Sequence, residues 1–126
     1  MKSFFSFSKT LLMVCVGLVS LLLVSTTQAQ WTQCNGPFGG NVICFAVSGT
    51  TVFEGTNTGG VFRSIDNGEN WTKVNNGLTY RYVQALAVSG TTLFAGTFSD
   101  GVYRSTENSQ NWTEVNTGLT NKDVRA

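Results

Sequence analysis

One stretch of the chain occurs twice, and this internal repeat restricts the possible folds more than any other feature. Residues 42–78 align with residues 83–119 at a constant offset of 41 positions. The shared text includes Ala-Val-Ser-Gly-Thr-Thr, which starts at Ala46 and again at Ala87. A fixed offset over so much of the chain predicts two copies of one structural unit, stacked or packed side by side.

Short apolar runs separated by glycine turns predict four strands in each copy. In the first copy the expected strands are 42–47, 52–56, 60–64 and 71–75, and in the second they are 83–88, 93–97, 102–105 and 112–116. No stretch after residue 29 shows a sustained helical period. Repeats of about 40 to 50 residues with four short strands are typical of β-propeller blades. We therefore expect an all-β fold with four-stranded antiparallel blades at about 42–75 and 83–116.

Two shorter segments look like incomplete copies. Residues 31–35 resemble the last strand of a repeat, because Trp31-Thr32 matches Trp71-Thr72, and residues 124–126 match the start of a first strand. A propeller closes with about four or more blades. We therefore expect a partial propeller with an orphan N-terminal strand, two complete blades and a C-terminal stub, and we expect missing blades or further domains C-terminal to Ala126.

The first 29 residues have the features of a secretory signal peptide. Lys2 and Lys9 give a positive start, residues 11–24 form an apolar run, and Ala29 ends a group of small residues. The apolar run is shorter than the roughly 18 residues that a membrane span needs. The sequence predicts cleavage after Ala29 and export of residues 30–126 to the extracellular space or cell surface, with no membrane attachment afterwards.

Charge and composition argue against several classes of function. After residue 29 the chain keeps six basic and seven acidic residues, so no basic patch favours nucleic-acid binding. Histidine, the commonest general base and metal ligand, does not occur in the sequence. We expect no cofactor and no metal site.

Two cysteines, Cys34 and Cys44, remain in the expected exported part. An oxidising compartment permits a disulfide between them. Both occupy positions where the repeat elsewhere has small apolar residues, on strands expected to lie too far apart for disulfide geometry. The sequence favours free cysteines and leaves the pairing open.

The motif Ser64-x-Asp66-x-Gly68-x-x-Trp71 predicts a tight hairpin tip. Asp66 can turn its carboxylate onto backbone N–H groups ahead of it. Asn67-Gly68 is a strong hairpin-turn pair, since both residues tolerate positive φ. Trp71 would then open the fourth strand as a large apolar anchor.

This motif resembles the Asp box, or BNR repeat, of Asp-box β-propellers. That family includes bacterial sialidases, xyloglucanases, sortilin-type receptors and photosystem assembly factors. The resemblance implies that Ser64, Asp66, Gly68 and Trp71 fix the hairpin between the third and fourth strands. The second copy keeps Ser105 and Trp112 but has Glu107 and Ser109 in place of the aspartate and glycine. A serine at positive φ costs roughly 1 kcal/mol, so we expect that hairpin to be looser or to use another turn.

The family hosts enzymes and binding proteins, and the residues here favour a binding or scaffold module. Asp100 is the one acid expected on a loop at the end of the blade opposite the Asp boxes. Its counterpart in the first copy is Gly59, so no paired carboxylates for glycoside hydrolysis face each other. We expect no catalytic residues in this chain. The alternatives are a glycoside hydrolase, sialidase-like or xyloglucanase-like, with its catalytic residues outside this segment, and a two-blade lectin that assembles into a ring.

The loops opposite the Asp boxes differ between the copies, which is where repeat proteins usually bind ligands. They hold the candidate binding face, which is Tyr80, Arg81, Tyr82, Phe98 and Asp100. We expect these residues to lie together, far from Asp66, and to contact a protein or glycan ligand. Alternatively, Tyr80 and Tyr82 only cover the edge of the next blade.

Overall fold

The computed structural model describes residue 30, residues 32–106 and residues 109–125. The chain forms two units, Met1–Thr32 and Gln33–Ala126, and every strand of the described residues lies in the second unit. The expected signal peptide at 1–29 lies outside the described residues, as do Trp31, Glu107 and Ala126. Within the described ranges no helix is long and apolar enough to cross a bilayer.

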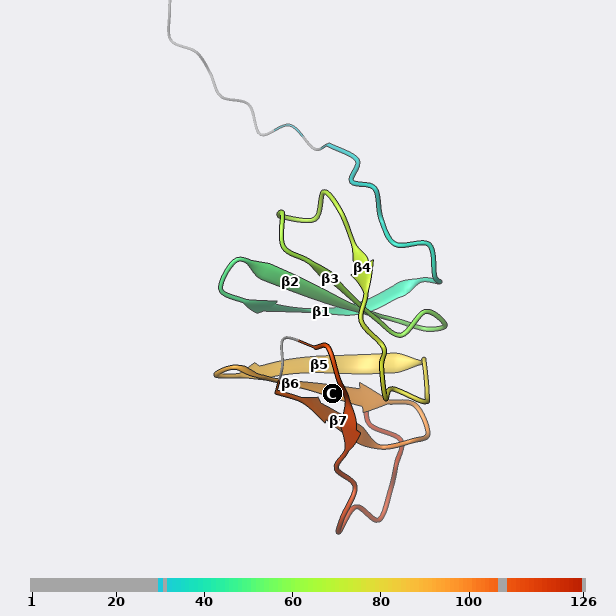
Figure 1. Cartoon of the computed structure of the whole chain (residues 1–126). Helices are drawn as coiled ribbons and strands as arrows, with labels where there is room; N and C mark the ends of the chain where they lie inside the picture. The colour runs from blue at the N-terminus through green and yellow to red at the C-terminus, as the bar shows by residue number, and fades with distance from the viewer. Residues whose placement is uncertain (1–29, 31, 107–108, 126) are drawn as a thin grey trace, which may run out of the picture. The chain divides into compact units, whose positions relative to one another are not determined.

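The second unit contains two four-stranded antiparallel sheets, each with its strands in chain order (Figure 1). The first sheet consists of β1 (Val42–Ser48), β2 (Thr51–Thr56), β3 (Val61–Ser64) and β4 (Thr72–Lys73). The second consists of β5 (Val83–Ser89), β6 (Thr92–Thr97), β7 (Val102–Ser105) and β8 (Thr113–Glu114). The expected all-β class and the two sets of four antiparallel strands are therefore confirmed.

The last strand of each sheet is shorter than expected. β4 and β8 have two residues each, although main-chain pairing continues one residue further, where Val74 N–H donates to Val61 O and Val115 N–H donates to Val102 O. The strand expected at 31–35 is not formed in its described part, 32–35. The chain bends there instead, since Gly36 N–H donates to Cys34 O across 2.9 Å.

Both sheets share one register, including its irregularity. A β-bulge lies between Val42 and Cys44 in β1 and between Val83 and Ala85 in β5. A bulge inserts one residue and changes the direction of the side chains around it. The residue inside the bulge, Ile43 in the first sheet and Gln84 in the second, therefore has no paired residue on the neighbouring strand.

The hydrophobic core lies between the two sheets, with β1 facing β5 (Figure 1). The first sheet and its connection contribute Cys44, Ala46, Phe53, Val61, Val74 and Leu78, and the second contributes Val83, Leu86, Val88, Leu93, Ala95, Tyr103 and Trp112. Cross-strand partners share a face, so each sheet uses one face only. The two buried faces are not equivalent in the repeat. Phe53 corresponds to Phe94, so the core residue Ala95 is one position further along its strand and belongs to the other face of the repeat unit.

The outer face of the first sheet repeats the pattern that the second sheet buries. Phe45 and Val47 correspond to Leu86 and Val88 of the core, yet they are 59% and 61% exposed. The sheets thus stack in the same sense, with the back of one against the front of the next. The stacking has no two-fold symmetry and can in principle continue in both directions.

A glycine in each sheet lets the next stretch of chain approach closely. A Cβ atom on Gly55 would lie 2.7 Å from Cγ1 of Val83, and one on Gly96 would lie 2.6 Å from Cγ1 of Val124. Val124 N–H also donates to Thr97 O across 2.9 Å. The C-terminal residues therefore meet the second sheet as β5 meets the first.

Candidate functional site

The antiparallel order divides the turns between two ends of the sheets. The β1–β2 and β3–β4 turns lie at one end, which we call the Asp-box end. The β2–β3 turn and the β4–β5 connection lie at the other, the crossover end, where Gly60 N–H donates to Arg81 O across 3.1 Å. Tyr80 and Asp66 accordingly lie at opposite ends, as the sequence predicts.

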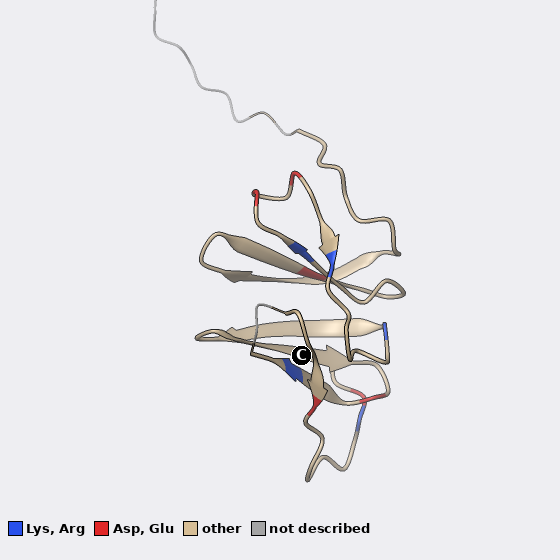
Figure 2. Cartoon of the chain, viewed as in Figure 1, with Lys and Arg blue, Asp and Glu red and all other residues tan. Residues whose placement is uncertain are grey.

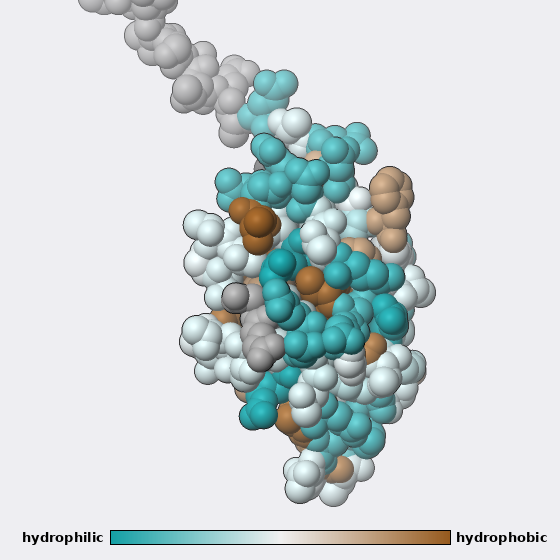
Figure 3. All heavy atoms as spheres, in the orientation of Figure 1, coloured by the Kyte–Doolittle hydropathy of each residue, from teal (hydrophilic) through white to brown (hydrophobic). Residues whose placement is uncertain are grey.

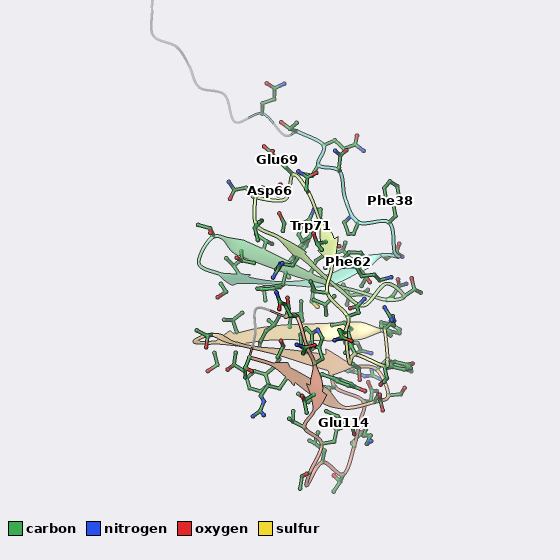
Figure 4. The ribbon with its side chains drawn as sticks, in the orientation of Figure 1. Phe38, Phe62, Asp66, Glu69, Trp71 and Glu114 are labelled. Carbon is green, nitrogen blue, oxygen red and sulfur yellow. The ribbon has the colours of Figure 1, made fainter. Side chains whose placement is uncertain are left out.

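The turn between β3 and β4 is held by its own side chains (Figure 4). Oδ1 of Asp66 accepts from Asn70 N–H at 2.9 Å and from the Ser64 hydroxyl at 2.7 Å, and Oδ2 accepts from Asn70 Nδ2 at 2.8 Å. Gly68 N–H donates to Ser64 Oγ across 2.8 Å. Asn67 and Gly68 have φ values of 57° and 90°, as expected for this pair.

These donors also control the charge of the Asp66 carboxylate. They lower its pKa from 3.8 to about 2, the Asn70 backbone N–H being the largest cause, followed by the Asn70 and Ser64 side chains. A carboxylate whose two oxygens accept three hydrogen bonds in its own turn has a structural role. The geometry agrees with the capping function that the motif implies.

The second copy of the turn keeps part of this geometry despite its substitutions. Ser109 has φ 65° and is fully buried, so it takes up the positive φ of Gly68. Burial holds the serine there, because tertiary packing can outweigh the cost of positive φ. Residues 107 and 108 lie outside the described residues, so the expectation of a looser hairpin or another turn stays a prediction. Ser105 Oγ, which corresponds to Ser64 Oγ, is buried and has no hydrogen-bond partner among the described atoms.

The two tryptophans of the motif differ in burial. Trp112 is in the core, where its Nε1–H donates to Val74 O across 2.7 Å and its backbone N–H donates to Asn76 O across 2.8 Å. Trp71 is half-buried and lies just before β4, so it does not open the strand as expected. Trp112 therefore connects the outer edges of the two sheets.

Side chains that the sequence analysis missed stabilise the crossover end. In the first sheet, Thr56 Oγ1 donates to Gly60 O, and the side chain of Asn75 accepts from Val61 N–H at 2.7 Å and donates to Gly59 O at 2.6 Å. The same bonds recur in the second sheet, from Thr97 and Asn116. Thr56 and Thr97, and likewise Asn75 and Asn116, are identical residues 41 positions apart, and this identity could have identified them from the sequence.

Asp100, part of the expected binding face, braces the second sheet internally. Its Oδ2 accepts from the hydroxyl of Thr79 at 3.0 Å and from the hydroxyl of Tyr103. The Tyr103 hydrogen bond is the largest cause that lowers the pKa of Asp100, and burial, with this same contact, raises the pKa of Tyr103. The carboxylate joins the β4–β5 connection to the β6–β7 turn.

Tyr82 and Phe98 come together as expected. Their rings stack with centroids 5.3 Å apart and planes 14° apart. They border a pocket of about 320 Å³, which Ile43, Gln84 and Arg125 complete. Ile43, Gln84 and Arg125 occupy one and the same position of three successive repeats, each 41 residues apart. We call this the axial pocket.

Arg81 and Tyr80 do not line the axial pocket. Arg81 borders a separate, open groove of about 520 Å³, together with residues of β4 and the β4–β5 connection, which are Lys73, Asn75, Asn76, Gly77, Leu78 and Thr79. Tyr80 is half-buried and borders neither cavity. The structure thus divides the expected face into a pocket, a groove and an internal brace.

The side of the molecule seen in Figures 2 and 3 has no single large charged or hydrophobic patch. Basic and acidic residues are interspersed over both sheets (Figure 2). The face drawn in Figure 3 is mostly hydrophilic, and its apolar residues form separate small patches. Phe38, fully exposed, points away from the sheets (Figure 4).

Cys34, at the surface, and Cys44, half-buried in β1, form no disulfide with each other. Burial is the largest cause that raises the pKa of Cys44 to about 11. No group of three or more potential metal ligands occurs within residues 32–106 and 109–125. The axial pocket and the Arg81 groove, which residues of the expected binding face border, are the strongest candidates for ligand contact.

Comparison with known proteins gives no relative: no family model, no curated protein and no solved structure matches the chain.

Proposed function

We propose that the chain is part of an exported β-propeller of the Asp-box type and serves as a non-enzymatic binding module. The Asp66 turn supports the family assignment, since its hydrogen bonds perform the role that the motif has in Asp-box proteins. The N-terminal signal pattern supports export. The ligand is a glycan or a protein.

Sheet stacking supports the propeller. The internal interface joins the back of the first sheet to the front of the second, and on the opposite face of the first sheet Phe45 and Val47 remain exposed. Val124 already lies on Gly96 as Val83 lies on Gly55. Further blades on either side would complete a ring in which every sheet makes the same contacts.

The observation that carries the binding role is the composition of the axial pocket. Three equivalent positions of successive repeats hold an apolar, an amide and a guanidinium side chain, Ile43, Gln84 and Arg125, beside the Tyr82–Phe98 stack. In the first sheet the counterparts of the stack are Asn41 and Asn57, joined by a hydrogen bond of 2.9 Å. The fold thus does not need the aromatic pair. A flat aromatic surface beside polar groups suits a ligand with an apolar face and hydroxyl or carboxylate groups.

The carboxylates near this pocket support a non-enzymatic role. Asp123 Oδ2 accepts from Nη2 of Arg125 at 2.7 Å, and Oδ2 of Asp100 is engaged by Thr79 and Tyr103. Neither is poised as a general acid opposite a second free carboxylate.

Binding to a panel of immobilised oligosaccharides and exported proteins tests the proposal. The double variant Tyr82→Ala, Phe98→Ala should lose at least about tenfold in affinity, as expected when central aromatic contacts are truncated. The matched control is Tyr80→Ala, a tyrosine of the same connection that borders neither cavity. Equal binding by the double variant and wild type, or hydrolysis of an oligosaccharide by the chain, would contradict the proposal.

A further inference from the structure

The residues that border the groove beside Arg81 have counterparts in the second sheet, and at one of these positions the sign of the charge differs. At the repeat offset, Lys73 corresponds to Glu114 and Arg81 corresponds to Lys122. The β4 position therefore carries a cation and the β8 position an acid (Figure 2). The β4–β5 connection and its counterpart both carry a cation.

In the second sheet these two positions form an ion pair. Lys122 Nζ lies 3.2 Å from Glu114 Oε1, and the Asn116 side chain donates to the same oxygen. The ion pair shows that the side chains of residues 114 and 122 are close enough to contact each other. The acid belongs to the outermost strand of its sheet (Figure 4).

In the first sheet the same point is bordered by two cations. Lys73 and Arg81 are both exposed and both border the groove of about 520 Å³. The Lys73 ammonium lies 5.6 Å from the centroid of the Phe62 ring, which holds it at this edge of the sheet. Asp100 of the β6–β7 turn contacts this connection, but its Oδ2 accepts hydrogen bonds from Thr79 and Tyr103.

We propose that this groove binds an oxyanion, a carboxylate or sulfate group, at the place that the Glu114 carboxylate fills in the second sheet. The ammonium and guanidinium groups would each donate to it, and Asn75 would stand where Asn116 donates to Glu114. The inference is independent of the axial pocket, because the two cavities share no bordering residue. The same group can come from a free ion or from an acidic carbohydrate.

A two-dimensional ¹⁵N NMR titration of the chain, purified from an exporting host, tests the site. The probe is sodium sulfate, compared with sodium chloride at equal ionic strength because exposed charges are screened by salt. Sulfate should cause saturable shifts of the Gly77 and Arg81 amides and none at Gly118 and Lys122. Shifts equal to those in chloride would overturn the proposal.

Two charge exchanges between the repeats make the test sharp. Lys73→Glu should create the ion pair of the second sheet in the first and weaken sulfate binding at least about fivefold. Glu114→Lys should open a second site, with new saturable shifts at Gly118 and Lys122. Both residues are exposed, and unchanged core amides show that each variant is folded. Unchanged binding in the first variant, or no second site in the other, refutes the proposal.

A sulfated disaccharide distinguishes the two sources of the anion. Tighter binding than sulfate at the same amides supports an acidic carbohydrate as the ligand, and equal binding supports a free ion. Disaccharide-induced shifts of the Gly77 and Arg81 amides that survive in Lys73→Glu would overturn the assignment of the site.

Discussion

Trp112 offers the sharpest test of how the two sheets are held together. The side chain is 5% exposed, and its indole N–H donates to Val74 O across 2.7 Å. Trp112→Phe removes this donor and leaves the Val74 carbonyl without the bond, at a cost of about 1–3 kcal/mol. The smaller ring buries less apolar surface, which adds about 1 kcal/mol. We expect a total loss of about 3 kcal/mol.

For a folded unit of this size, Gln33–Ala126, such a loss lowers Tm by more than about 10 °C. The assay is thermal unfolding followed by circular dichroism. The matched control is Trp71→Phe, at the equivalent position of the first repeat. Trp71 is half-buried and makes no indole hydrogen bond to the described residues, so its replacement should cost less than about 1 kcal/mol. Equal losses of Tm in the two variants would refute the role of the Trp112 indole.

Three further predictions concern titratable groups. Because the pKa of Asp66 is lowered to about 2, its contribution to stability is complete above the unfolded pKa of about 4 and is lost as pH falls toward 2, so Tm of wild type should fall more over this range than Tm of Asp66→Asn. Burial raises the pKa of Glu54, which is 2% exposed and whose Oε1 has no hydrogen-bond partner among the described residues, so its charge destabilises the fold above the unfolded pKa. Glu54→Gln should therefore raise Tm at neutral pH, with the gain disappearing in acid; a lower Tm would contradict this. Iodoacetamide should alkylate Cys34 and spare Cys44, whose pKa is about 11, as peptide mass mapping of the folded protein would show.

The features that could be predicted from the sequence are those that depend on neighbouring residues and occur in both repeats. Four strands per copy followed from apolar runs and glycine turns, and the φ values of Asn67-Gly68 followed from the chemistry of that pair. The strand expected at 31–35 failed where it could be tested, because a strand depends on a hydrogen-bonded neighbour that the local pattern does not contain. Ser109 takes up the positive φ of Gly68, because its burial outweighs the local preference.

The candidate site was only partly predictable. The face was correctly placed opposite Asp66, and Tyr82 and Phe98 do meet. The division of the remaining residues could not be predicted from the sequence, since it depends on the direction in which each side chain leaves the β4–β5 connection or the β6–β7 turn. Asp100 shows this, because the acid expected to face a ligand accepts a hydrogen bond from the Tyr103 hydroxyl at the end of the second sheet.

Differences at equivalent positions are the best guide to binding in this chain. Positions that the two sheets share, such as Thr56 and Thr97, make the same hydrogen bonds and therefore explain the fold. Where the two repeats have different residues at one position, the change must be compensated by a new contact or leave a polar or charged group without a partner. Glu114 in place of Lys73 changes the sign of one charge while the opposing cation stays, and the second sheet compensates with an ion pair of 3.2 Å. Among the described residues Lys73 and Arg81 form no ion pair, so solvent ions or a ligand supply the counter-charge in the first sheet.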